Sequence, residues 1–295
     1  MKEKQNRDGI THYKEIKRVL YVVLALNWAV AAAKVFVGLL SKSSGMTADG
    51  FHSFSDGTSN IVGLVGIAIA FRPKDADHPY GHKKFETFFS LGIAFLLGIV
   101  CFELLQKGIG RLRNPVLPEI TVLSFVVMAV TLIVNILVMK YERRKGGILQ
   151  SDILVSDSMH TRADIFTSIS VIISFVAIKL GFPILDAIVT LVIAFFIAYA
   201  AYEIIRDSSR VLCDSIVITD VKRIEDIVLK VNGVKSCHKI RTRGRADDIN
   251  LDLHVQMMPD IHLSDAHNIS YEIENQVRKN IPEVSDIVVH MEPEE

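Results

Sequence analysis

Long apolar stretches alternate with short polar breaks over the first two thirds of the chain. Six stretches each supply roughly the 20 predominantly apolar residues that a helix needs to cross the hydrocarbon core of a bilayer. The breaks between them contain turn or charge signals such as SKSSG, RNPVLPE and GFP. The pattern predicts an α-helical membrane protein with six transmembrane helices, at residues 19–41, 44–71, 86–112, 119–141, 152–180 and 183–205. A polar tail, residues 1–18, precedes this domain, which we place at residues 19–207.

After about residue 208 the pattern changes to short alternating segments. Residues 248–257, DINLDLHVQM, alternate strictly between apolar and polar side chains, which is typical of a half-buried strand. Residues 219–233 have the Asp start, helical apolar spacing and Gly stop of a helix. An amphipathic helix, LSDAHNISYEIENQVRKNIP, and a last strand, SDIVVHME, follow. The order predicts a small α+β domain of the ferredoxin-like or metallochaperone-like αββαβ type over residues 208–295.

Composition and charge narrow the class of protein. Half of the 295 residues are hydrophobic and the formal net charge is zero, so no basic patch is present for nucleic acid. Three cysteines lie far apart, at Cys101, Cys213 and Cys237. Their spacing predicts neither a disulfide framework nor a thiolate zinc site, and fits a reducing compartment. The polar first 18 residues also argue against a secretory signal.

Lysine and arginine near the ends of the predicted spans indicate the orientation. With the N-terminus inside, 14 of these residues lie on the inner side and 5 on the outer side. Because inner loops carry the positive excess, both termini are expected in the cytoplasm. We expect an integral protein of a prokaryotic inner membrane.

Two of the spans carry the same polar pattern, DGFHSFSD at 49–56 and DSMHTRAD at 157–164. On a helix, offsets of 3 and 7 residues fall on one face. Each span therefore has a polar stripe, formed by Asp49, His52 and Asp56 in one and by Asp157, His160 and Asp164 in the other. An acidic group at mid-bilayer costs roughly 2.5–3.5 kcal/mol. A cation held between two facing stripes would offset this, whereas the alternative is that these are capping or snorkelling residues at helix ends.

Four of these side chains predict a metal site: His52, Asp56, His160 and Asp164. Two imidazole nitrogens and two carboxylate oxygens suit tetrahedral Zn²⁺, and mixed ligands also admit Co²⁺, Cd²⁺, Fe²⁺ or Mn²⁺. The sequence leaves three roles for Asp49 and Asp157: they could support the ligands, line an access path or cap a helix. Because metal binding needs neutral imidazole and ionised carboxylate, protons could drive the metal out, with helices rocking around the site.

The two HxxxD motifs, the six spans and the small C-terminal sheet domain resemble the cation diffusion facilitator family of metal/proton antiporters, over nearly the whole chain. Members with His and Asp at these four places are usually zinc exporters, and members with Asp or Asn in place of the first His lean to iron or manganese. The resemblance implies a secondary transporter for Zn²⁺, not an enzyme, that works as a homodimer in the lipid bilayer. It implies Zn²⁺ both as cargo and as a structural or regulatory ion.

Further groups match metal positions of relatives. In the loop DADHPYGHKKFE, Asp75, His78 and His82 are spaced like a cytoplasmic-loop site, with Asp77 as a substitute for Asp75. Pro79 argues against regular helix there. The alternative is a polar loop with incidental histidines.

In the tail, five residues match positions where relatives hold a zinc pair between two subunits: His238, His254, His267, His290 and Glu292. Relatives have Asp at the Glu292 place, which leaves the binuclear geometry open, and Cys237 could substitute as a ligand. The alternative is exposed histidines on a soluble sheet. Lys84 and Asp214 match an ion pair that links the two domains in relatives, or are ordinary surface charges.

Three other functions compete with zinc export. An exporter of the same family could prefer Fe²⁺ or Mn²⁺, and a membrane sensor or assembly factor could bind metal without moving it. An intramembrane metallohydrolase is disfavoured because the sequence has no HExxH motif and four protein ligands leave no open position for water.

Overall fold

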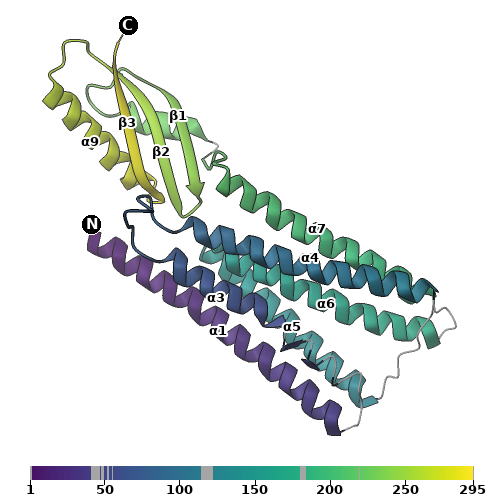
Figure 1. Cartoon of the computed structure of the whole chain (residues 1–295). Coiled ribbons are helices and arrows are strands. Elements are labelled where there is room, and N and C mark those ends of the chain that lie inside the picture. Colours follow the sequence, from purple (N-terminus) through teal and green to yellow (C-terminus); the bar gives the residue numbers. More distant parts are fainter. Residues whose placement is uncertain are drawn as a thin grey trace. The chain divides into compact units, whose positions relative to one another are not determined.

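The structure is a computed structural model of the whole chain (Figure 1). It describes residues 2–40, 47, 50, 51, 53, 54, 56–113, 122–179, 184–218 and 220–294. The chain divides into two compact units, Met1–Ser208 and Ser209–Glu295.

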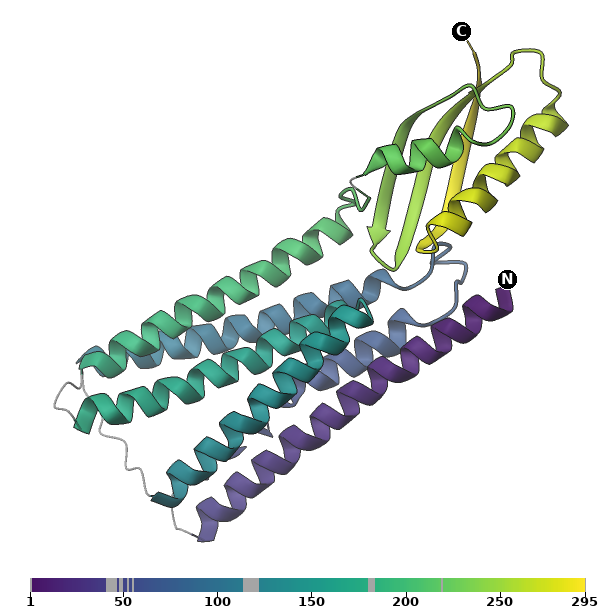
Figure 2. The same ribbon diagram turned by 180° about the vertical axis from the view of Figure 1, so that it is seen from behind.

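Long helices make up the first unit, where they run side by side as a bundle in both views (Figures 1 and 2). They are α1 (Lys2–Leu40), α3 (Thr58–Ala70), α4 (Lys84–Arg113), α5 (Val122–Ile148), α6 (Asp152–Lys179) and α7 (Ile184–Leu212). In the described part, four stretches are long and apolar enough to cross a membrane: Thr11–Leu40, Lys84–Arg113, Phe125–Ile148 and Ala187–Leu212. They coincide with the first, third, fourth and sixth predicted spans. The other two predicted spans overlap α3 and α6 and are the least apolar, so the count of six stays a prediction.

The bundle is apolar both inside and outside, as a membrane protein requires. Ile16, Ile93 and Ile153, from α1, α4 and α6, are fully buried in one interior cluster. On the outside, Phe95 is 70% exposed and Phe195 is 68% exposed. Large aromatic side chains are rarely so exposed in soluble proteins, and lipid is the environment that suits them.

Small residues permit close helix contacts near the predicted metal site. A Cβ atom on Gly57 would lie 2.7 Å from Nε1 of Trp28, and one on Gly50 would lie 2.6 Å from Cγ2 of Val35. Both distances are too short for a real side chain, so these glycines let α1 approach the segment before α3 closely. Trp28 is therefore a packing residue at this contact.

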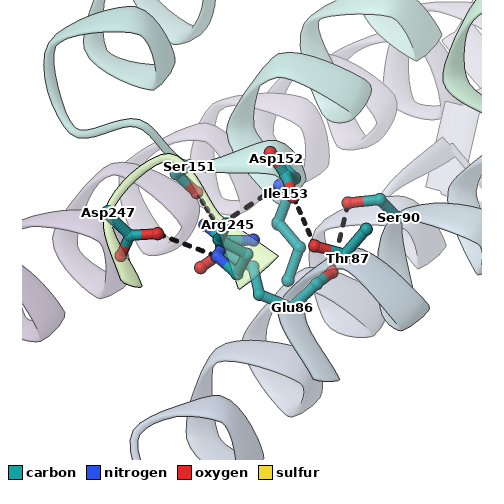
Figure 3. A network of polar contacts seen from close by, with 8 residues as sticks. All are labelled: Glu86, Thr87, Ser90, Ser151, Asp152, Ile153, Arg245 and Asp247. Atoms are coloured by element: carbon teal, nitrogen blue, oxygen red, sulfur yellow. Dashed lines mark hydrogen bonds and ion pairs between the residues drawn. The ribbon is translucent and has the colours of Figure 1, made fainter. Parts of the chain in front are cut away.

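A polar network joins the beginnings of α4 and α6 (Figure 3). The Glu86 carboxylate is buried, and its Oε1 accepts hydrogen bonds from Ser151 Oγ and from the Ile153 backbone N–H. Thr87 Oγ1 donates to Asp152 Oδ2. Glu86 thus satisfies a free backbone N–H in the first turn of α6 and favours its positive dipole end.

The second unit has the predicted αββαβ order. Its elements are α8 (Val221–Val228), β1 (Ser236–Arg245), β2 (Asp248–Met257), α9 (Leu263–Asn280) and β3 (Val284–Pro293). The strand order is β1-β2-β3, with β1 antiparallel to β2 and β2 parallel to β3. The parallel pair needs a crossover, which α9 supplies.

The sheet of this unit has one apolar and one polar face. Leu251, Leu253 and Val255 of β2 share a buried core with residues of both helices, such as Ile224 and Ile273. Because side chains alternate along a strand, the polar residues of β2 project from the opposite face. Asp220 caps α8 by accepting from the backbone N–H of Arg223, as its position predicted.

Candidate metal centres

Asp56, His160 and Asp164 form the first candidate centre. Asp56 lies just before α3, and the other two lie one turn apart on α6. One ligand atom from each residue lies within 4.8 Å of the other two. His160 is 5% exposed, whereas the two aspartates are half-buried. Of the predicted set, His52 and Asp49 lie outside the described residues.

Two carboxylates beside an imidazole are unfavourable among apolar helices unless something positive joins them. A buried charge costs several kcal/mol when it has no partner. Nitrogen and oxygen donors at this spacing suit a divalent transition-metal ion. The geometry is therefore that of a binding site for a dication or for protons.

A small cavity of about 60 Å³ adjoins this centre. Its polar lining includes both aspartates of the centre together with Lys34, Ser53, Glu103, Lys107, Asn135, Thr167 and Ser168. Lys34 is buried, and its Nζ donates to Ser53 Oγ at 2.9 Å. Lys34 lies toward the C-terminal end of α1, and Glu103 and Lys107 lie toward that of α4, so the cavity extends from the centre along the bundle.

A chain of hydrogen-bonded polar side chains ends at Asp157, three residues before His160 on α6. Asn27 Nδ2 donates to Asn60 Oδ1 at 3.0 Å, and Asn60 Nδ2 donates to Asp157 Oδ2. Asp157 lies five residues inside α6, so the structure excludes the helix-cap role considered for it. Asn27 begins this hydrogen-bonded chain.

Glu142 is a buried acid that the sequence analysis did not identify. It is 0% exposed, and its Oε2 accepts from Thr161 Oγ1 at 2.9 Å. The predicted span ended at residue 141, where charged residues begin, but α5 continues to Ile148. The signal in the sequence that could have identified Glu142 is its position one residue beyond an apolar span.

The loop between α3 and α4 brings together the three predicted residues of the second candidate centre. Asp75 Oδ1 lies 3.1 Å from His78 Nδ1, and Asp75 Oδ2 lies 3.3 Å from His82 Nε2. The loop turns at Gly81, whose φ of +98° suits glycine. The segment is not helical, as Pro79 predicted. Asp77, the suggested substitute, is exposed and is not part of this cluster.

The surroundings of Asp75 favour its ionised form. The backbone N–H of His78 donates to Asp75 Oδ1 at 2.7 Å. This hydrogen bond, together with the side chain of His78 and the charge of His82, holds the pKa of Asp75 below its ordinary value. An ionised carboxylate next to two imidazoles is a suitable ligand set for a transition metal.

The third candidate centre is a row of histidines across the polar face of the tail sheet. His238 of β1 pairs with His254 of β2, which pairs with His290 of β3. A bulge follows His238, where Lys239 has a φ of +51°. The centroids of the His254 and His290 rings are 4.5 Å apart.

Glu292 lies at the centre of this row. Its Oε1 lies 2.6 Å from His254 Nδ1 and 3.5 Å from His290 Nε2, and its Oε2 lies 3.1 Å from His238 Nε2. The hydrogen bond with His254 holds the pKa of Glu292 below its ordinary value. His238, His254 and Glu292 form the tightest ligand group of this row.

Three other residues of the tail have different roles. His267 is not part of the ligand group: it lies on the exposed side of α9, with its ring edge-on to Tyr271 at 4.8 Å between centroids. Cys237 points into the core, opposite to His238 on β1, so it does not substitute as a ligand. His262 caps α9 by accepting from the backbone N–H of Ser264.

Lys84 and Asp214 belong to different compact units. Lys84 begins α4, and Asp214 lies two residues after α7 with a φ of +56°. Their ion pair stays a prediction.

Two family models match almost the entire chain. The model of the cation efflux transmembrane domain matches residues 20–213, and that of the cation efflux protein cytoplasmic domain matches residues 219–294. Together they span the helical unit and the sheet unit.

Several curated proteins are similar along their full length. An uncharacterized transporter of Methanocaldococcus jannaschii is 27% identical over 283 residues, covering 95% of this chain and 99% of the relative. The manganese efflux system protein MneS of Bacillus subtilis is 27% identical, covering 95% and 98%. The cation-efflux pump FieF of Shewanella oneidensis is 28% identical, covering 92% and 94%. A solved MamM C-terminal domain is 25% identical and covers 25% of this chain and 94% of that domain, with a TM-score of 0.25.

Proposed function

We propose that this chain, which belongs to the cation efflux family of membrane transporters, exports Zn²⁺ from the cytoplasm in exchange for protons. The family membership rests on the match to residues 20–213. Membership of this family makes the chain a cation efflux transporter. What we propose beyond it is that the metal is Zn²⁺ and that protons move in exchange.

The observation that carries the proposal is the cluster of Asp56, His160 and Asp164. Their ligand atoms gather within 4.8 Å inside the helical unit, although Asp56 is more than 100 residues from the other two. With His52, the set would hold two imidazoles and two carboxylates, which suit tetrahedral Zn²⁺.

Exchange with protons follows from the chemistry of these donors. Imidazole must be neutral and carboxylate ionised to bind the metal, so metal and protons compete for the same atoms. A centre without the metal and without the protons would leave unpaired negative charge among apolar helices. A gradient of protons can therefore drive metal release.

The cavity beside the centre supports a path for alternating access. If both termini are cytoplasmic, Glu103 and Lys107 of α4 lie toward the outer side, so the cavity of about 60 Å³ leads outward from the metal site. Rocking of the helices that carry the ligands would open the inner side in turn.

The identity of the metal distinguishes two versions of this function. Relatives named as manganese efflux proteins cover this chain almost completely, which favours an exporter of Mn²⁺ or Fe²⁺ as the second candidate. Zn²⁺ remains the first choice because His52 adds a second nitrogen donor, and Mn²⁺ favours oxygen donors.

The tail and loop centres fit a regulatory or structural role. The family match of the cytoplasmic domain indicates a homodimer. The exposed face that carries His238, His254 and Glu292 would then lie within reach of a second subunit, and metal there would stabilise the pairing of the two tails.

The experiment is a competition transport assay with the full-length protein in proteoliposomes. Zn²⁺, Cd²⁺, Co²⁺, Fe²⁺ and Mn²⁺ are offered together while a dye reports the internal pH. We expect the highest flux for Zn²⁺ with protons moving in the opposite direction. Preference for Mn²⁺ would select the second candidate, and tight binding without any flux would replace the transporter with a metal sensor.

A further inference from the structure

Glu142 and Asp157 are a pair of buried acids on two helices that pack along each other, α5 and α6. Glu142 is 0% exposed and Asp157 is 1% exposed. Their carboxyl groups interact directly through their side chains. Neither residue is among the four predicted metal ligands.

In each carboxyl group, one oxygen accepts a hydrogen bond and the other does not. Thr161 Oγ1 donates to Oε2 of Glu142, and Asn60 Nδ2 donates to Oδ2 of Asp157. The other two oxygens, Oε1 of Glu142 and Oδ1 of Asp157, receive no hydrogen bond from any donor among the described residues. Buried acceptors are rarely left in this condition.

An occupant that donates a hydrogen bond and removes a negative charge would satisfy both oxygens. Two carboxylates in contact in a buried site do not both ionise. A proton on one carboxyl group supplies the missing donor and leaves a single negative charge. A metal ion fits less well, because Asn60 turns its NH₂ group toward Asp157 while its oxygen accepts from Asn27.

We propose that Glu142 and Asp157 share a proton, and that this proton leaves when the metal centre of Asp56, His160 and Asp164 is loaded. The inference rests on the proposed exchange and assigns one of its protons to a place outside the metal ligands. Asp157 lies about one helical turn before His160, and Glu142 is within the electrostatic reach of Asp164.

Several charged groups lie on the elements that carry or surround the pair, and Asp164 interacts electrostatically with Glu142. Asp164 and His160 lie on α6, and Asp56 lies before α3. At the end of α5, Lys145 is paired with Glu15 of α1, with 3.8 Å between Nζ and Oε2.

The sign of the coupling follows from these charges. While the metal centre is empty, the aspartates nearby favour retention of the shared proton. An arriving dication repels it, the O–H bond breaks, and H⁺ leaves on the side from which the metal entered. When the metal departs on the other side, the pair takes up H⁺ there, so one proton moves against each metal ion.

The test uses Glu142→Gln, which preserves shape and the hydrogen bond from Thr161 but removes one acid. The full-length protein in proteoliposomes is given a Zn²⁺ gradient, and metal and proton fluxes are measured together. We expect Zn²⁺ flux to persist and the number of protons per metal ion to fall by about one, the share of a single carboxyl group. Glu203→Gln, at a half-buried acid of α7 outside both the pair and the cavity, is the matched control and should keep the wild-type ratio.

A second measurement does not depend on transport. In the solubilised wild-type protein, the infrared C=O stretching band of a protonated carboxyl group should be present without metal and disappear when Zn²⁺ is added. It should be missing throughout in Glu142→Gln. A wild-type band that persists with Zn²⁺, or an unchanged proton ratio in the variant, overturns the shared proton while leaving export in place. Absence of Zn²⁺ flux in the wild type would instead reject the proposed function.

Discussion

His160 and His254 both lie beside carboxylates, yet their surroundings differ. His160 is 5% exposed between helices, whereas the His254 side chain is 19% exposed on the open face of a sheet. Asp56 and Asp164 reach His160 through the packing of helical segments, whereas Glu292 reaches His254 through the register of adjacent strands.

The difference bears on what each centre can do. In the helical centre, uncompensated charge is costly because no bulk water surrounds it, so the departing ion must be replaced by something else. The tail centre is partly solvated and can remain without a metal at little cost. The first arrangement suits exchange of cargo, and the second suits a resident or sensing ion.

Loss of the imidazole from the helical centre should have the largest effect. His160→Ala should reduce metal flux by more than about 100-fold, since even the groups that support metal ligands are worth about 10- to 100-fold. Flux into proteoliposomes measures this, with His12→Ala in α1 as the control. Near-normal flux in His160→Ala would contradict the assignment of the ligand.

The nitrogen content of the helical centre should set its selectivity. His52→Asp exchanges an imidazole for a carboxylate, so preference should move from Zn²⁺ toward Mn²⁺ by about tenfold, equivalent to ~1.4 kcal/mol. Paired transport assays with the two ions measure the ratio. An unchanged ratio would mean that His52 does not contact the cargo.

Removal of the carboxylate from the tail should weaken the tail centre alone. Glu292→Gln should lower metal binding there by about tenfold and leave flux through the helical centre largely intact. Metal titration of the full-length protein measures it, with His267→Ala as the matched control outside the ligand group. Loss of flux equal to that of His160→Ala would abolish the distinction between the two centres.

The same variant should change the response of the protein to acid. Because the pKa of Glu292 is lowered by the hydrogen bond with His254, its contribution to stability is complete above the ordinary glutamate pKa of about 4.3. The contribution is lost as the pH falls through the lower folded value. Over this acidic range, the melting temperature should therefore fall less steeply with decreasing pH for Glu292→Gln than for the wild type.

The smallest effect on metal binding is expected at Cys237, despite its position beside His238. Burial raises the pKa of this thiol to about 11, so the thiolate that binds metals does not form near neutral pH. Cys237→Ser should lower the free energy of unfolding by about 1–3 kcal/mol, because it buries a hydroxyl group. Metal titration should be unchanged, and a reduced metal content would place the thiol among the ligands.

Local periodicity was sufficient to predict the tail fold. The alternation of residues 248–257 gave the face of each side chain in β2, and the same rule places His290 and Glu292 together on β3. Applied to β1, it would also have shown that Cys237 and His238 point to opposite faces. The bulge at Lys239 was not predictable, because it depends on pairing with β2.

The helical centre was harder to predict in full. The repeated spacing of Asp, His and Asp identified the residues that the structure brings together at Asp56, His160 and Asp164. Glu142 was missed because hydropathy ended the span at residue 141, while packing against α6 extends α5 and buries the acid. The partners of Asp157 come from two other helical segments, and sequence spacing carries no signal for such contacts.

Glu86 has a mechanical consequence for the transport cycle. Its carboxylate fastens the first turn of α6 to α4, and leaving such a buried acceptor without donors costs about 1–3 kcal/mol or more. A tilt of α6 alone would break these hydrogen bonds, so α4 and α6 should move together as one rigid pair. The movement that exposes the metal centre would then occur between this pair and the remaining helices, not between α4 and α6.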